Sequence, residues 1–132
     1  MPEAAKAHTK AGAKAFIVYY WQVVDYAQRT LATEDLVAVS SPECAGCIGG
    51  IRSIRHVAST GGSITGGSPT ATVKRVWPLN GGAFQVDAEV MSTPETILSP
   101  GSGSKHFPGG RAVVHLTLDP TPTGWVVGDL DV

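Results

Sequence analysis

The stretch Ser41-Pro42-Glu43-Cys44-Ala45-Gly46-Cys47 has the pattern of a helix start that carries two thiols one turn apart. A serine is a favourable helix cap, proline suits the first helical position, and the helix dipole stabilises a carboxylate in the first turn. We therefore expect a helix from Ser41 or Pro42. Residues three apart on a helix are neighbours, so Cys44 and Cys47 can form a disulfide.

The chemistry of this cysteine pair has more than one interpretation. A thioredoxin-type redox centre also places its Cys-x-x-Cys pair at a helix N-terminus, where the thiolate is stabilised. Such a centre follows a parallel strand, whereas helical patterns precede Cys44 and Cys47. We favour an inert structural disulfide, and a redox role or reduced thiols are the alternatives. We expect no metal, because the four histidines are scattered and no second ligand pair has zinc-site spacing.

Composition narrows the class of protein. The chain has 132 residues, of which 42% are hydrophobic and 16% are charged, and its formal net charge is -1. Its lysines and arginines form no basic block, so we expect no nucleic-acid partner. No apolar run approaches the roughly 20 residues of a membrane span. No phosphate-binding glycine motif occurs, so we expect no cofactor.

The N-terminal half has helical periodicity. Residues 2–8 are polar and rich in alanine, and we expect a flexible lead-in over residues 1–8. A helix of about 20 residues should follow, because apolar residues recur at intervals of three and four; they are Ala13, Phe16, Tyr20, Val23 or Val24, Ala27 and Leu31. Thr33 should cap a short second helix. The third helix should end at Gly61-Gly62, and Gly49-Gly50 suggests a close packing contact within it.

The pattern changes after residue 62 to the alternation of β-strands. Residues 63–65 fit a short edge segment, and alternating strands are expected over 71–77, 84–90, 111–118 and 125–132. Asn80-Gly81-Gly82 predicts a hairpin turn. Residues 94–110 are rich in Gly, Ser and Pro, and we expect a long loop there.

This order of elements predicts an α+β domain over residues 9–132. We expect three N-terminal helices packed on a curved antiparallel sheet of about four strands. A sheet wrapped around the long first helix would form the cone of nuclear transport factor 2 and ketosteroid isomerase, which belongs to the cystatin-like folds. An open two-layer sandwich is the rival architecture.

Several short runs carry a resemblance to a known family. The runs Ala15-Phe16-Ile17-Val18-Tyr19-Tyr20-Trp21, Asp25-Tyr26-Ala27 and Cys44-Ala45-Gly46-Cys47 resemble an uncharacterised domain of predicted actinobacterial lipoproteins. The resemblance implies an exported, extracytoplasmic domain, tethered to a membrane by a lipidated cysteine and a flexible linker upstream of these residues. We expect the full-length protein to be a lipoprotein that is encoded by a bacterium or by a prophage. The resemblance brings no established activity.

We expect a binding domain without enzymatic activity, whose partner is an envelope protein or a small apolar ligand. The candidate ligand pocket contains Phe16, Tyr20, Trp21 and Trp77. The candidate partner loop carries Lys105, His106 and Phe107, because long loops in small domains are often functional.

An enzyme of the ketosteroid-isomerase type is the alternative, since Tyr20 and Asp25 are residue types that such sites use. Five residues separate them on the helix, which points their side chains apart. Asp87 and Glu89 share a strand face, where cross-strand ion pairs with Arg111 or His115 are the favoured interpretation. A homodimer through outward residues such as Val76 and Val113 is a further possibility.

Overall fold

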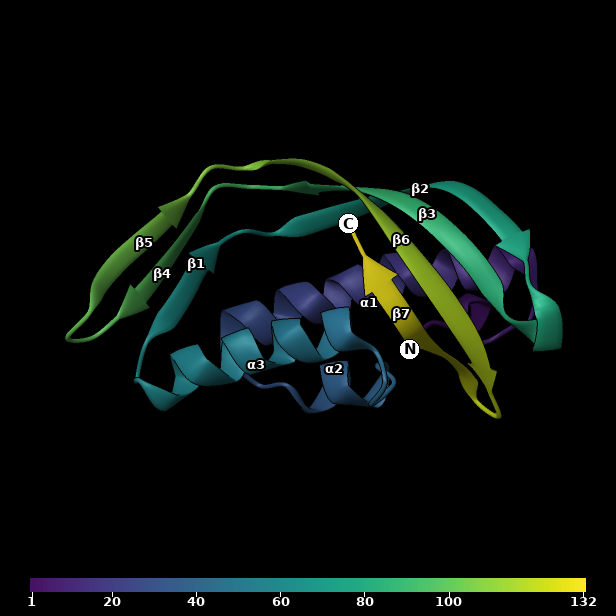
Figure 1. Ribbon diagram of the computed structural model, residues 1–132, viewed down its shortest axis with the longest axis horizontal. Helices are drawn as coiled ribbons and strands as arrows, with labels where there is room; N and C mark the ends of the chain where they lie inside the picture. Colours follow the sequence, from purple (N-terminus) through teal and green to yellow (C-terminus); the bar gives the residue numbers. More distant parts are fainter.

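Three α-helices lie beneath an arch of β-strands in the computed structural model, which describes residues 1–132 (Figure 1). The helices are α1 (Lys10–Thr30), α2 (Glu34–Ala38) and α3 (Ala45–Ser59). There are also two short 3-10 turns: η1 (Glu3–Ala5) precedes α1, and η2 (Asn80–Gly82) connects two strands. The α+β class predicted from the sequence is confirmed.

Seven antiparallel strands form two sheets, where one sheet of about four strands was expected. The strands are β1 (Ser63–Gly66), β2 (Pro69–Pro78), β3 (Phe84–Ser92), β4 (Glu95–Ser99), β5 (Gly103–Phe107), β6 (Gly110–Thr121) and β7 (Gly124–Asp131). The large sheet has the order β2-β3-β6-β7, and the small sheet has the order β1-β4-β5. Figure 1 shows the small sheet continuing the arch of the large one toward the C-terminal end of α3, which β1 and β4 contact.

Short breaks at glycine or proline divide three long strands between the two sheets. The breaks lie between β1 and β2, between β3 and β4, and between β5 and β6. At the first break Gly66 and Gly67 have φ angles of 73° and 68°, which side chains with a Cβ rarely adopt. Pro94 and Pro108 lie at the other two breaks and lack the N–H that a strand would use. The chain therefore bends where its backbone cannot continue a regular ladder.

The predicted face of the first helix forms the centre of the core. Thr9 caps α1, and its hydroxyl accepts a hydrogen bond from the Gly12 N–H at 3.0 Å. Phe16 and Ile17 are completely buried, and they belong to the same cluster as the inward residues of the large sheet. Those sheet residues alternate along β3 and β6 as predicted, and they are Val86, Ala88, Val90, Val114, Leu116 and Leu118.

Residues 1–8 do not form the flexible lead-in that their composition suggested. They include η1, and Ala5 is completely buried. The indole N–H of Trp125 donates to the carbonyl of Ala7 at 3.2 Å, and a ring nitrogen of His8 lies 2.8 Å from the carbonyl of Thr121. The polar sequence gave no indication of these contacts, because their partners come from the far end of the chain.

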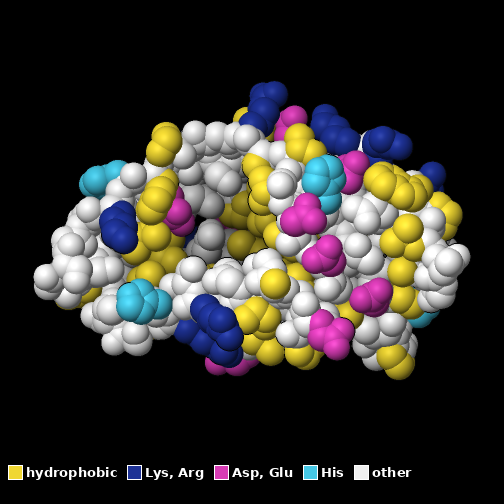
Figure 2. Space-filling view, viewed as in Figure 1, with side chains coloured by type: hydrophobic (Ala, Val, Ile, Leu, Met, Phe, Trp, Pro, Cys, Tyr) yellow, Lys and Arg dark blue, Asp and Glu magenta, His cyan; other side chains and the backbone are white.

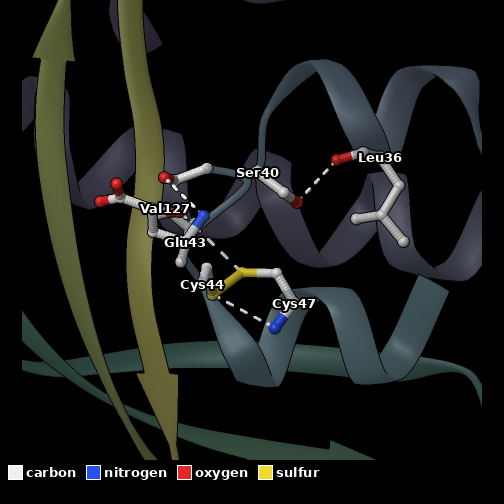
Figure 3. The surroundings of a disulfide bond; sticks show 7 residues. Leu36, Ser40, Glu43, Cys44, Cys47 and Val127 are labelled. Atoms are coloured by element: carbon white, nitrogen blue, oxygen red, sulfur yellow. Dashed lines mark hydrogen bonds between the residues drawn. A yellow bond between two sulfur atoms is a disulfide. The ribbon is translucent and has the colours of Figure 1, made fainter. Parts of the chain in front are cut away.

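The third helix begins later than expected, at Ala45 rather than at Ser41 or Pro42. The Ser41 N–H donates to the carbonyl of Val127 in β7, so its backbone pairs with a strand. Cys44 becomes the helix cap, and its sulfur accepts a hydrogen bond from the Cys47 N–H at 3.1 Å (Figure 3). The close helix contact also lies elsewhere: a side chain at Gly46 would collide with Leu130, whereas Gly49 and Gly50 face open space.

Cys44 and Cys47 form the predicted disulfide, and both are buried. Figure 3 shows the pair beneath the segment that joins α2 to α3, beside Val127. The disulfide thus lies where the first turn of α3 meets the edge of β7.

Residues 94–110 form a hairpin rather than a long loop. β4 and β5 pair with each other, and β4 also pairs with β1. Every residue of β5 is exposed, so no hydrophobic alternation marks it as a strand. Its Gly and Lys residues also have low strand propensity, which explains why the composition suggested a loop.

Replacing both Cys44 and Cys47 by alanine should lower the free energy of unfolding by about 2 kcal/mol, the chain-entropy value for closing a loop of about four residues. Urea unfolding in the presence and absence of a reductant measures the difference. The double variant serves as the control, because reductant should not change its unfolding midpoint. An unchanged wild-type midpoint under reducing conditions would contradict a stabilising disulfide.

Candidate functional site: a hollow beneath the arch

The four residues of the predicted ligand pocket do not meet in one cavity. Phe16 is completely buried and Tyr20 is 2% exposed, so both belong to the packed core. Trp21 is half-buried and borders a hollow beneath the arch. Trp77 lies in β2, where the Arg75 guanidinium is 4.8 Å from its ring centre. Only Trp21 of the four remains at the hollow.

Tyr20 and Asp25, the two residues considered for isomerase-type chemistry, also lie apart. Burial raises the pKa of the Tyr20 phenol to about 12, and a hydrogen bond with Ser40 offsets part of this increase. A carboxylate oxygen of Asp25 accepts from Arg29 Nε, 3.3 Å away and one turn along α1. Tyr20 therefore faces the α2–α3 connection, whereas Asp25 engages its own helix.

The hollow has a volume of about 370 Å³ and lies between α1 and the bends of β3 and β6. Figure 2 shows a recess in this face of the molecule, with hydrophobic side chains visible inside it. Its size falls within the range of small-molecule sites in proteins. Its lining residues are Trp21, Val90, Ser92, Pro108, Gly110, Arg111, Ala112, Val114 and Val132.

Polar atoms without partners lie along the same side of α1. The indole Nε1 of Trp21 is buried and has no hydrogen-bond partner, and the same holds for Asp25 Oδ1 and Gln28 Oε1. Trp21, Asp25 and Gln28 follow one another at intervals of four and three positions, so they share one face of the helix. A buried polar atom without a partner costs about 1–3 kcal/mol. A ligand group that accepts from Trp21 would recover part of that cost.

The residues of the predicted partner loop divide between the two faces of the small sheet. Lys105 and Phe107 lie opposite Ile97 and Glu95 in the β4–β5 register, on the face that Ile64 turns to the core. His106 lies on the other face, where its Nδ1 is 3.0 Å from the Thr96 hydroxyl. Hence two of the three residues share the concave side of the arch.

A carboxyl group on this concave side has an altered acidity. Partial burial raises the pKa of Glu95 above its ordinary value. No charged partner compensates for the desolvation. This carboxyl group therefore becomes protonated more readily than an exposed glutamate.

The outer face of the large sheet carries the expected cross-strand ion pairs. His115 Nδ1 lies 2.7 Å from an Asp87 oxygen, and Arg111 Nε lies 3.8 Å from a Glu89 oxygen. Val113 is also on this face and is 52% exposed. Val76 is not: it pairs with the buried Val86 and points inward, which removes it from the surface considered for a homodimer.

No three His, Cys, Asp or Glu side chains gather as a possible metal site. No helix combines the length and the apolar character needed to cross a membrane.

The hollow was not predictable from residue types alone. The alternation along 112–118 identifies Ala112 and Val114 as inward residues. The recess itself combines residues of α1, β3 and β6 with Val132 from the end of the chain, and their meeting depends on the tertiary structure.

Residues 1–103 match a family of unknown function, DUF6318. The match covers most of the chain, which therefore belongs to this family. None of the curated proteins matches the sequence.

Several solved structures have the same fold at low sequence identity. The intermembrane space region of the chloroplast protein ARC6 has a TM-score of 0.71 at 13% identity, and the match covers 94% of this chain and 95% of that one. A protein titled Rd1NTF2_05, with substitutions, has a TM-score of 0.55 at 12% identity, with coverages of 93% and 98%. A periplasmic fragment of TraM has a TM-score of 0.54 at 17% identity, with coverages of 89% and 92%. The fold is therefore similar to that of nuclear transport factor 2.

Replacing Asp87 by asparagine should lower the pKa of His115, because the hydrogen bond from His115 to that carboxylate is the main cause of its raised value. A histidine whose pKa is raised by folding stabilises the native state below its unfolded value of about 6.5, and this contribution is lost as pH rises through the folded value. NMR titration of the His115 ring measures the shift. Glu89→Gln is the matched control and should leave the titration unchanged; an unaltered His115 titration in Asp87→Asn would refute the pairing.

Proposed function

We propose that this protein is an extracytoplasmic binding domain that holds a small apolar ligand in the hollow beneath the arch. The ligand carries a hydrogen-bond acceptor. The observation that carries the proposal is Trp21: the residue borders a mainly apolar recess of about 370 Å³, and its indole Nε1 is buried without a hydrogen-bond partner.

The lining residues suit such a ligand. Val90, Ala112 and Val114 provide apolar walls, and burying apolar surface contributes about 25 cal/mol per Å². The indole N–H supplies the single directional contact, which orients the ligand. Ligand sites of this kind combine mostly apolar walls with a few placed polar groups.

The location outside the cytoplasm is supported by the disulfide between Cys44 and Cys47, because disulfides persist in oxidising compartments. The runs at residues 15–21 and 44–47 resemble exported lipoproteins, so we propose that a lipidated cysteine upstream tethers the domain to a membrane. Two structural neighbours are named as a periplasmic fragment and an intermembrane space region. The alternative ligand is an envelope protein, which would insert an apolar side chain into the hollow.

Binding is favoured over acid–base catalysis by the arrangement of the titratable groups. Tyr20 is buried on the Ser40 side, and Asp87 and His115 pair on the outer face of the sheet. General acid–base chemistry needs such groups within hydrogen-bonding distance of one substrate. The polar residues around the hollow are Trp21, Ser92 and Arg111, none of which is a usual general acid or base, and we assign the orienting contact to Trp21.

Titration with acetophenone, a small aromatic ketone, should shift the indole N–H resonance of Trp21 in a ¹H–¹⁵N correlation spectrum. Ethylbenzene has a similar shape but no acceptor, and it should bind more weakly. Ala112→Trp should weaken acetophenone binding by about tenfold or more, equivalent to about 1.4 kcal/mol, because the new side chain fills the recess. Ala112 is exposed to the hollow, so the substitution leaves the packed core intact.

Val113→Trp provides the matched control, since it adds the same side chain to the opposite face of the same strand. It should bind acetophenone like the wild type. Equal affinity in the Ala112→Trp variant, or shifts confined to residues far from Trp21, would rule out the hollow as the ligand site.

A further inference from the structure

A second depression lies at the side of the arch, between the N-terminal half of α1 and the edge strand β2. It is an open groove of about 670 Å³, and it is separate from the hollow. Lys10 and Lys14 border it from α1, and Lys74 and Arg75 border it from β2. No carboxylate is among its lining residues. Four cationic side chains therefore surround one groove in a chain whose formal net charge is -1.

The strand that forms this groove is an open edge of the large sheet. The order β2-β3-β6-β7 leaves two edges. The β7 edge is occupied, because Ser40 forms a parallel bridge with Val127 and the Val127 N–H donates to the carbonyl of Val39 at 2.9 Å. The far side of β2 has no strand neighbour. Backbone donors and acceptors on that side are therefore available to an added strand.

The irregularity of β2 adds to its positive charge. The register with β3 shifts between Val73 and Arg75, so Lys74 is the extra residue of a β-bulge. Lys74 and Arg75 are consecutive and both exposed, whereas a regular strand would turn them to opposite faces. Dark blue side chains gather along the upper right of Figure 2, over β2 and β3.

Nearby acidic groups do not neutralise the groove. Asp87 lies opposite Arg75 in the register, but its carboxylate is bonded to His115 at 2.7 Å. Arg75 is instead placed over the Trp77 ring. Lys10, Lys14 and Lys74 form no ion pair.

Lysines on an edge strand commonly prevent sheets from joining by their edges. They repel a neutral or basic strand, because such a strand would desolvate the ammonium groups without compensating them. A strand that carries carboxylates is attracted instead, because its negative charge complements the positive charge of the groove. The same residues that discourage self-association thus select for an acidic partner.

We propose that the groove binds an extended acidic segment of a partner protein, which adds to the free edge of β2 as a further strand. Its backbone pairs with β2, and its carboxylates lie against Lys10, Lys14 and Lys74. This is recognition by β-strand addition, in which main-chain hydrogen bonds supply affinity and side chains supply specificity. An anionic membrane surface would meet the same charges but would make no use of the strand edge.

The test compares three labelled eight-residue peptides by fluorescence anisotropy at low ionic strength. Alternating Glu-Thr should bind. Alternating Glu-Pro carries the same charge but cannot pair as a strand, and it should bind at least about tenfold more weakly, because proline lacks the backbone donor. Alternating Lys-Thr should not bind. Amide resonances of β2 should shift on addition of the Glu-Thr peptide.

The double variant Lys10→Glu/Lys14→Glu should weaken Glu-Thr binding by at least about tenfold, by reversal of two charges that face the peptide. Both lysines are exposed, and carboxylates in the first helical turns are compatible with α1, so the variant should fold. Lys105→Glu is the matched control and should bind like the wild type, since Lys105 lies in the small sheet away from the groove.

Three results would overturn the proposal: no binding of the Glu-Thr peptide at millimolar concentration, equal binding of the Glu-Pro peptide, or equal binding by the double variant. Vesicles containing phosphatidylglycerol complete the comparison. Vesicle binding that the double variant abolishes, together with absent peptide binding, would assign the groove to an anionic membrane surface instead.

Discussion

The apolar side of α1 lies against the concave side of the large sheet, and the remaining elements are arranged around this contact. Phe16 and Ile17 are completely buried beside Val86, Leu116 and Leu118. Full burial of one such side chain is worth about 1.5–3 kcal/mol, so the contact accounts for a substantial part of the stability of a small domain. The strands arch over α1, and the hollow lies between this helix and the ends of β3 and β6 (Figure 1).

Two segments close the ends of this arrangement. The N-terminal residues pack on Trp125, and the connection between α2 and α3 pairs with Val127 while the disulfide holds the first turn of α3. Both contacts involve β7 or the turn before it. The β7 side of the molecule is therefore covered, whereas the hollow under the arch and the free edge of β2 remain accessible.

The two accessible regions differ in chemistry, which is consistent with two different ligands. The lining of the hollow is mainly apolar and includes Trp21, whose buried indole N–H has no partner, so we assign its specificity chiefly to shape and to that hydrogen bond. The groove at β2 is cationic and borders unpaired backbone, so its specificity depends on charge and strand pairing. Under the two proposals, the small ligand and the protein partner occupy separate places and do not compete.

Local sequence patterns were sufficient for the elements whose neighbours are close in the chain. The face of α1, the hairpin at residues 80–82 and the Cys44–Cys47 disulfide depend on spacing and on turn chemistry, which a single sequence displays. The same is true of the alternation that turns Ala112 and Val114 inward. The α+β class follows from the order of these elements.

Other features were decided only by tertiary structure. Residues 1–8 are ordered by Trp125, α3 begins at Ala45 because β7 uses the Ser41 backbone, and β5 is a strand only because β4 supplies its partner. The candidate pocket was divided for the same reason, since Trp21 and Trp77 belong to surfaces that the fold separates. Pairing between distant segments depends on where the chain bends in space, and residue periodicity carries no record of that geometry.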